Sequence, residues 1–170
     1  MSSCRLPAGI GRCKLQVTSC RISTKSGTIC RWLFNQYLCG QMKSYRDLEI
    51  YTESRRLAVE VHKISMGLPK FELYEEGGQI RRSSKSVTSM IVEGYVRRRY
   101  RADFIKHLIY AQSECDETIV HLDNLFETES LRDKAKYESL KRDYQELSKK
   151  INRFTLWVET NLKEPASKVL

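Results

Sequence analysis

The chain has 170 residues, of which 41% are hydrophobic and 30% are charged, with both signs of charge intermixed. This balance is typical of a folded helical protein and excludes a chain that is disordered throughout. No stretch approaches the ~20 consecutive apolar residues of a membrane-spanning helix, so we expect no membrane partner.

Charge is distributed unevenly along the chain. The formal net charge is +9, from 30 Lys and Arg against 21 Asp and Glu. Six of those bases and none of the acids precede residue 42, which leaves 24 bases and 21 acids in residues 42–170. The high isoelectric point is therefore largely a property of the first 41 residues and says little about what the rest of the chain binds.

Cysteine follows the same division, since five of the six cysteines precede Met42 and only Cys115 follows it. No C-x-x-C pair is present, which argues against a zinc site. The chain also lacks an apolar signal segment, which argues against a secreted disulfide framework. We expect a reducing, cytoplasmic setting.

Residues 1–41 are rich in Ser, Thr, Gly, Cys and Arg and show no sustained periodicity. Three interpretations compete: a disordered tail, a basic targeting peptide, or translated upstream sequence preceding a true start at Met42. We favour the third, because composition changes abruptly at Met42. We expect residues 1–41 to be unstructured or spurious, residues 42–164 to form one domain, and residues 165–170 to be a disordered tail.

The sequence from Met42 onward contains four segments with helical periodicity. They are predicted at residues 45–65, 75–99, 101–126 and from Ser130 to about Pro165, with Asp47 and Ser130 as helix-start residues. The connection at 68–74 contains Phe71 and Leu73, which we expect to fold back over the bundle end. Short connections require antiparallel neighbours, so the predicted fold is all-α: an antiparallel up-down four-helix bundle with a disordered N-terminal extension.

Two of these segments carry particular packing information. The second has Ser83, Ser84 and Gly94 on its inward stripe, which predicts close approach of a neighbouring helix. The third has a second apolar row, Ile105 and Ile109, for which we expect a partner subunit. The fourth segment has the clearest pattern, because seven apolar positions recur in alternating steps of three and four from Tyr137 to Val158.

No catalytic or metal constellation stands out. Glu117 and His121 are spaced to face one another on a helix, but a di-iron bundle requires a Glu-x-x-His repeat that the sequence lacks. The acids around Cys115 predict a solvated face or salt bridges. Cys115 itself is predicted to be a small core residue. We therefore expect no enzymatic activity, cofactor, metal or small-molecule substrate.

Basic residues concentrate between positions 81 and 106. The block comprises Arg81, Arg82, Lys85, Arg97, Arg98, Arg99, Arg101 and Lys106, against Glu93 and Asp103. Arg97 to Arg101 and Lys106, together with Lys85, could neutralise phosphates, and Tyr95 and Tyr100 could stack on exposed bases. Solubility and salt bridges explain the block equally well. For Arg81 and Arg82 we favour structural pairing with Glu93 and the acids of the third helix. We assign Gly94, next to Glu93, a structural role as well.

A run of segments in this region is recognisable. They are Gln79 to Val87, Ile91 to Tyr95, Arg97 to Arg99, Asp103 to Ile105, Ala111 to Ser113, Asp116 to Thr118 and Leu125 to Thr128. Together they resemble the bacterial four-helix-bundle family first noticed as reading frames in intervening sequences of large-subunit ribosomal RNA. The resemblance covers roughly residues 43–160. In the second helix, relatives often have Pro and Asn where this chain has Thr88 and Met90. This chain is therefore not expected to make the polar contact that the Asn makes in those relatives.

The resemblance implies an up-down bundle assembled into a ring-like homopentamer, with no established enzymatic activity. A relative is the accessory protein of diversity-generating retroelements, in which a basic surface meets reverse transcriptase and RNA. Our first hypothesis is therefore a non-enzymatic oligomeric module that binds structured RNA through the basic block. The alternative is an adaptor that binds another protein, such as a reverse-transcriptase-like partner, with the basic block used for subunit pairing.

Overall fold

A computed structural model of the chain describes residues 43–162, and this part is helical with no strand. Its elements are η1 (Tyr45–Asp47), α2 (Glu49–Ser65), α3 (Lys70–Tyr74), α4 (Glu76–Val96), α5 (Arg101–Glu127) and α6 (Lys134–Asn161). The predicted all-α four-helix bundle is confirmed. The predictions for residues 1–41 and 165–170 lie outside the described residues. None of the described helices is both long enough and apolar enough to cross a membrane.

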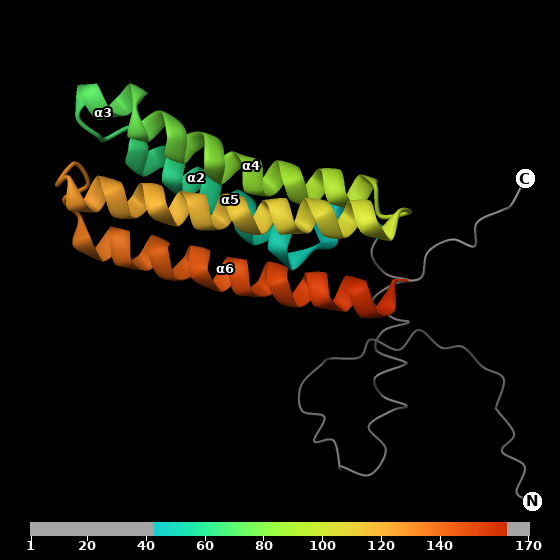
Figure 1. The fold of residues 1–170 in the computed structure, drawn as a ribbon. Coiled ribbons are helices and arrows are strands. Elements are labelled where there is room, and N and C mark those ends of the chain that lie inside the picture. The colour runs from blue at the N-terminus through green and yellow to red at the C-terminus, as the bar shows by residue number, and fades with distance from the viewer. Residues whose placement is uncertain (1–42, 163–170) are drawn as a thin grey trace, which may run out of the picture.

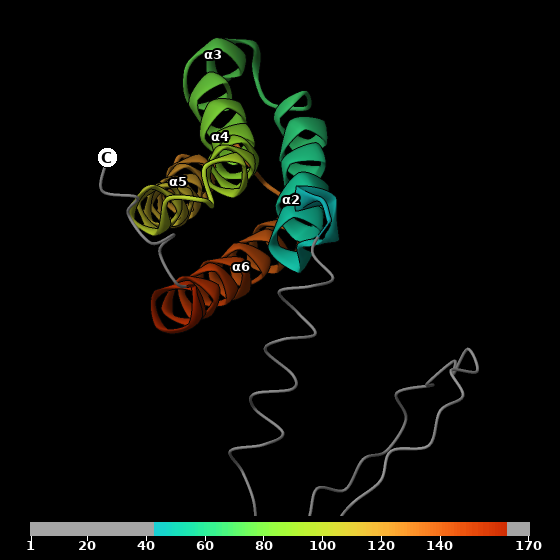
Figure 2. The ribbon, with the colours of Figure 1, turned by 90° about the vertical axis from the view of Figure 1, so that its right-hand side faces the viewer.

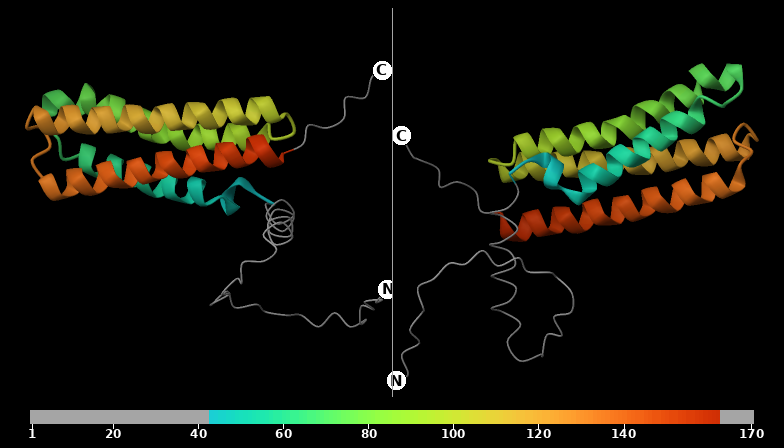
Figure 3. Two further views of the ribbon diagram at one scale, coloured as in Figure 1. Left: turned by 60° about the horizontal axis from the view of Figure 1, so that its bottom comes forward. Right: turned by 180° about the vertical axis from the view of Figure 1, so that it is seen from behind.

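The four long helices run alternately up and down (Figure 1). Viewed end-on, α2 and α5 occupy opposite corners, with α4 and α6 between them (Figure 2). The α4/α5 pair packs most extensively and the α2/α6 pair least. One end of the bundle therefore gathers η1, the α4–α5 connection and the end of α6, and the other end gathers α3 and the α5–α6 connection (Figure 3).

The first predicted helix is interrupted at Leu48. The backbone N–H of Ser44 donates to the Asp47 carboxylate at 2.8 Å, and the Arg46 N–H donates to the Ser44 hydroxyl at 3.3 Å, which closes η1 as a separate turn. Leu48 is then extended and buried, and it is the residue that precedes α2. The prediction of Asp47 as a helix-start acid is thus right for η1 and wrong for the longer helix.

The small residues of α4 do permit close packing against α5. The Thr118 hydroxyl donates to the Ser83 hydroxyl across the interface at 2.9 Å. At Gly94 an added Cβ would lie 3.0 Å from both the Phe104 ring and the His107 Cβ, so a larger side chain has no room there.

The buried row on α6 also agrees with the predicted heptad, with Tyr144 and Leu147 fully buried at its centre.

Three local predictions are wrong. Phe71 is 67% exposed, since the buried residues here are Leu68, which precedes α3, and Glu72, within it. Helix α4 ends at Val96, before the arginines. Helix α6 starts after Asp133, not Ser130, because Asp133 accepts the Lys136 backbone N–H at 3.0 Å.

Candidate nucleic-acid interface

The three consecutive arginines form a tight turn between α4 and α5. The backbone leaves the helix because Arg97 has φ −88° and ψ 5°, and the N–H of Tyr100 donates to the Arg97 carbonyl at 2.8 Å. We call Arg97 to Tyr100 the arginine turn. All four residues are exposed, with Tyr100 at 60%. The turn therefore places three arginines and one exposed phenol ring at a single end of the bundle.

Of the three arginines of the turn, Arg98 contacts Tyr95 and the other two have no acidic partner among residues 43–162. The Arg98 guanidinium lies 4.0 Å from the centroid of the Tyr95 ring and donates to the Tyr95 carbonyl at 2.9 Å. Among residues 43–162, Arg97 and Arg99 make no ion pair with a carboxylate. Full cationic charge on an exposed turn attracts phosphate, and guanidinium binds it in a bidentate manner.

Arg101 and Lys106 extend this surface onto α5. The Arg101 guanidinium donates to the backbone carbonyl of Glu159 at 3.4 Å, which ties the start of α5 to the last turn of α6. The Lys106 ammonium lies 5.7 Å from the centroid of the Tyr110 ring, about one turn further along α5. The arginine turn thus continues towards both the outer face of α5 and the end of α6.

The structure corrects two predicted members of the surface. Tyr95 is only 5% exposed and packs edge-on against Tyr45 at 6.3 Å, so its ring cannot stack on a base. Lys85 is 12 residues before Arg97, about 18 Å along the helix, and lines a groove between α2 and α4. Lys85 therefore does not belong to the arginine turn.

The residues predicted to pair structurally also have defined places. Arg81 donates to the Ser65 hydroxyl at 3.1 Å and to the Leu73 carbonyl at 2.7 Å, so its partners are not the acids that we predicted. Arg82 is exposed. Glu93 lies 3.5 Å from His107 Nε2. Arg81 consequently fastens the end of α2 and α3 to α4 and is not available to a ligand.

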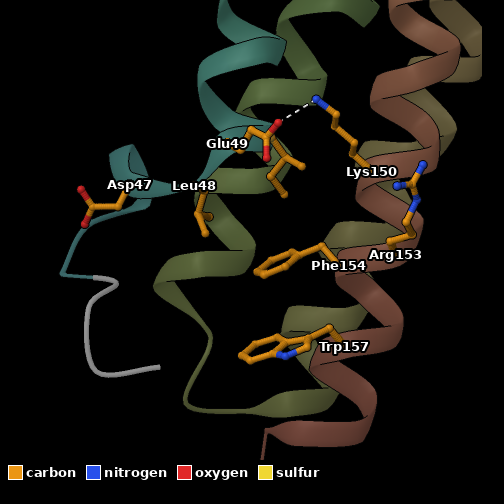
Figure 4. A pocket seen from close by; sticks show the side chains of 8 residues that line it. Asp47, Leu48, Glu49, Lys150, Arg153, Phe154 and Trp157 are labelled. Atoms are coloured by element: carbon orange, nitrogen blue, oxygen red, sulfur yellow. Dashed lines mark hydrogen bonds and ion pairs between the residues drawn. The ribbon is translucent and has the colours of Figure 1, made fainter. Parts of the chain in front are cut away.

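No pattern in the sequence predicts an aromatic groove that lies at the same end of the bundle as the arginine turn. It has a volume of about 700 Å³ and lies between the start of α2 and the last turns of α6. Its lining comprises Asp47, Leu48, Glu49, Ile50, Lys150, Arg153, Phe154 and Trp157. Figure 4 shows the Phe154 and Trp157 rings projecting from α6 towards Leu48.

The two rings of the aromatic groove are parallel. The centroids of Phe154 and Trp157 are 5.8 Å apart, with an interplanar angle of 7°. At the rim, the Lys150 ammonium bridges Glu49 and Glu53 at 2.7 and 2.6 Å, whereas Arg153 makes no ion pair within the described part of the chain. Parallel rings beside an arginine that makes no close ion pair in this part of the chain provide a surface on which a planar, anionic ligand can stack.

The histidine with acid neighbours is part of a structural network. His121 Nδ1 lies 3.0 Å from the Glu76 carboxylate, and Asn124 donates to the same oxygen at 2.6 Å. Burial alone would raise the pKa of Glu76, but these contacts outweigh burial and the net pKa lies below its ordinary value. No cluster of three or more potential ligand side chains among residues 43–162 is arranged to hold a metal ion.

The remaining candidates for chemistry are also accounted for by packing. Cys115 is buried in the core, and burial raises the pKa of its thiol, which keeps it protonated and unreactive. Asp123 accepts hydrogen bonds from Lys141 at 2.9 Å and from the Tyr137 hydroxyl at 2.8 Å. This acid of α5 therefore pairs with the neighbouring helix.

The family model of the 23S rRNA-intervening sequence protein matches residues 46–153, which span the bundle from η1 to the aromatic groove. The chain belongs to this family. The solved structure of a Bacteroides thetaiotaomicron protein of unknown function, described as a member of the S23 ribosomal protein family, is similar to it. That protein is 29% identical, with a TM-score of 0.58, over 63% of this chain and 95% of that chain.

Membership of the 23S rRNA-intervening sequence protein family confirms the resemblance seen in the sequence. The matched range includes the arginine turn and the groove between α2 and α4, but it ends at Arg153, before the two rings of the aromatic groove, Phe154 and Trp157. No curated protein matches the chain. The similar structure is of unknown function, and neither comparison identifies a partner for the basic end of the bundle.

Proposed function

We propose that this family member is a non-enzymatic, oligomeric module that binds structured RNA through the arginine turn. The supporting observation is that Arg97 and Arg99, two residues apart on one turn, are exposed and without a carboxylate partner among the described residues. Unpaired guanidinium groups on a rigid turn release counterions when they bind phosphates, and this release is the main source of affinity for nucleic acid. The family's name associates it with ribosomal RNA.

The aromatic groove gives the same end of the bundle a means of holding unpaired bases. Arg101 links the arginine turn to α6 at Glu159, two residues beyond Trp157. A phosphate backbone bound at the turn would therefore pass close to the groove. Stacking on aromatic rings is the usual way in which proteins recognise unstacked RNA bases, so we expect the bound RNA to contain an unpaired loop or bulge.

A charge-reversal experiment tests the proposal. The variant Arg97→Glu/Arg99→Glu leaves the Arg98–Tyr95 contact in place and should weaken binding to an RNA hairpin with a single-stranded loop by more than tenfold. Each lost phosphate contact should also reduce the slope of log affinity against log salt by about 1. The matched control is Arg132→Glu/Arg142→Glu, which changes the charge equally at exposed positions on other parts of the surface.

Two results would contradict RNA binding. One is affinity of the wild-type protein that is absent or independent of salt, and the other is equal weakening in the variant and its control. The alternative function, an adaptor whose basic turn pairs with carboxylates of another subunit or of a protein partner, predicts that Arg97→Glu/Arg99→Glu breaks the oligomer. The unpaired state of Arg97 and Arg99 within one chain supports this alternative too. A homopentameric ring and a cytoplasmic location are part of the proposal.

A further inference from the structure

A second groove lies between α2 and α4, which are neighbours in the end-on view (Figure 2). This groove, which we call the basic groove, has a volume of about 470 Å³. It is lined by Tyr51, Arg55, Ala58, Val59, His62, Lys85, Thr88 and Ser89. None of these residues is acidic, and Arg55 and Lys85 make no ion pair within residues 43–162. The groove therefore carries positive charge that the described part of the chain does not compensate.

The acids of α2 pair with a different helix. Lys150 of α6 lies 2.7 Å from Glu49 and 2.6 Å from Glu53. Lys136 of α6 lies 3.0 Å from Glu60. These three residues are all the acids of α2, and each of them has a partner on α6. As a result, α2 contributes bases and no acid to the basic groove.

The acids of α4 are directed to its other neighbour. Glu76 and Glu93 are the two acids of this helix. Glu76 lies 3.0 Å from Nδ1 of His121, and Glu93 lies 3.5 Å from Nε2 of His107, both on α5. The carboxylates of α2 and α4 thus meet α6 and α5, while the face between α2 and α4 collects cations. Such a face attracts a polyanion.

Three tyrosines connect the basic groove to the arginine turn. The centroids of the Tyr51 and Tyr45 rings are 4.9 Å apart, and those of Tyr45 and Tyr95 are 6.3 Å apart, both in edge-on contact. We call these residues, in the order Tyr51, Tyr45 and Tyr95, the tyrosine chain. They belong to α2, η1 and α4, so their contacts join these elements at the end of the bundle that carries the arginine turn (Figure 3).

Each ring of the tyrosine chain contacts one arginine. Arg55 donates to the hydroxyl of the first ring at 3.3 Å. Arg46 lies 5.6 Å from the centroid of the second ring, and Arg98 lies 4.0 Å from that of the third. Asp47, the acid next to Arg46, accepts the Ser44 N–H at 2.8 Å instead of pairing with it. A guanidinium that contacts a ring keeps its charge and its N–H donors, so these arginines can still bind phosphate.

We propose that an RNA strand held at the arginine turn continues along this face, with its phosphates bound by Arg46 and Arg55 and then by Lys85 in the basic groove. From Arg97 to Lys85 the path follows 12 residues of α4, about 18 Å. Cations in a line beside aromatic rings are typical of channels for single-stranded nucleic acid, which has a charge on every nucleotide. This path rests on the proposed function and extends it by naming the face that the RNA covers.

The dependence of affinity on RNA length tests the path. Fluorescence anisotropy of the full chain is measured with labelled oligouridines of about 4 and about 16 nucleotides, the limits of the usual site sizes. The wild type should bind the longer RNA more tightly. Arg46→Gln/Arg55→Gln/Lys85→Gln should lose most of this gain and bind the longer RNA more than tenfold more weakly. The slope of its log affinity against log salt should fall by about 2, because each phosphate contact with a single strand contributes about 0.7.

The matched control removes the same residue types from exposed positions outside this face. It is Arg132→Gln/Arg142→Gln/Lys149→Gln, which should bind both RNAs as the wild type does. All six substituted side chains are exposed, so each variant should fold, and circular dichroism checks this. The shorter RNA should bind the triple variant of the path nearly as well as the wild type, because the arginine turn is intact.

The possible outcomes separate this path from the proposed function. If the triple variant binds the longer RNA as the wild type does, or weakens no more than its control, the path is wrong. The proposed function stands in that case provided that Arg97→Glu/Arg99→Glu binds weakly. Weak binding by the triple variant alone would contradict the proposed function and retain the phosphate contacts of this face. A poly-glutamate peptide that binds the wild type as tightly as the longer RNA, and loses affinity in the triple variant, would overturn the path and assign the face to an acidic protein.

Discussion

The Cζ atom of Arg98 lies 4.0 Å from the centroid of the Tyr95 ring, and Arg98 also donates to the Tyr95 carbonyl. The side chain therefore caps the last turn of α4 and covers a buried ring with a charged group. Arg97 and Arg99 are exposed and make no ion pair among the described residues. The middle arginine accordingly positions the arginine turn, and Arg97 and Arg99 are the members available to a ligand.

This division of roles predicts different stabilities for two similar substitutions. Arg98→Gln should lower the free energy of unfolding by about 0.5–1 kcal/mol, the usual contribution of an exposed cation–π contact. Arg97→Gln should change it by less than about 0.5 kcal/mol, as expected of an exposed site without partners. Urea unfolding measures both. Equal losses would contradict the positioning role of Arg98.

The aromatic groove predicts a preference for unpaired RNA. Trp157→Leu should weaken binding to a single-stranded RNA by about 1–3 kcal/mol and leave binding to a fully paired duplex unchanged, because it removes a stacking surface and no charge. Trp157→Phe retains a ring and is the matched control. Fluorescence anisotropy of labelled RNA gives both affinities, and an equal loss for the two RNAs would exclude stacking.

Two adjacent glycines should respond in opposite ways to alanine. An added Cβ at Gly77 would lie 2.8 Å from the Glu72 carbonyl oxygen, a backbone atom that cannot move aside, whereas at Gly78 nothing lies within 4 Å. Gly77→Ala should therefore lower the free energy of unfolding by about 1–3 kcal/mol. Gly78→Ala should raise it by about 0.5–1 kcal/mol, since alanine favours the helix. Thermal unfolding compares the two, and a stabilised Gly77→Ala would refute the close contact with α3.

The buried hydroxyl of Tyr144 makes no hydrogen bond of good geometry among the described residues, although the Ser84 side chain lies within reach of it. Burial raises the pKa of this phenol, which therefore stays neutral. Tyr144→Phe should leave the free energy of unfolding unchanged or raise it by up to about 1 kcal/mol, because an unsatisfied buried hydroxyl is unfavourable. Tyr144→Ala should lower it by about 3–5 kcal/mol through the cavity. A clear loss in Tyr144→Phe would reveal a hydrogen bond at this position.

The pH dependence of stability should have a contribution from Glu60. Its pKa is lowered first by the hydrogen bond from Lys136, and Arg56 adds to the effect. A lowered pKa in the folded state contributes stability above the unfolded value, which is lost as pH falls through the folded pKa. Glu60→Gln should therefore destabilise the protein at pH 7, and its difference from the wild type should disappear once the pH is below the folded-state pKa of Glu60.

Glu114 provides the opposite case for the same measurement. Its pKa is raised by burial and by Glu117, so its ionised form is unfavourable in the folded state. The stability that the protonated acid contributes is present below the unfolded pKa and lost as pH rises through the folded pKa. Glu114→Gln should therefore stabilise the protein at pH 7. If the free energy of unfolding of Glu60→Gln and of Glu114→Gln changes with pH in the same way, both assignments are contradicted.

Helix existence and direction were readable from the sequence because burial along a helix leaves a repeating pattern. The heptad from Tyr137 to Val158 and the small residues Ser83 and Gly94 each record contact with a neighbouring helix. Helix ends were less predictable, because a cap depends on local hydrogen bonds that compete. At the start of α6 both Ser130 and Asp133 are suitable, and the buried Leu131 N–H donating back to the Leu125 carbonyl favours Asp133.

The sequence by itself determined the four amphipathic helices, the family segments and the cluster of arginines after α4. Only the tertiary structure decided which of those bases lie together, because side chains distant in the sequence meet only when helices pack. Packing buries Tyr95, directs Arg81 to Leu73, and separates Lys85 from the arginine turn. Packing also brings Leu48 next to Phe154 and Trp157, and no local pattern encodes that groove.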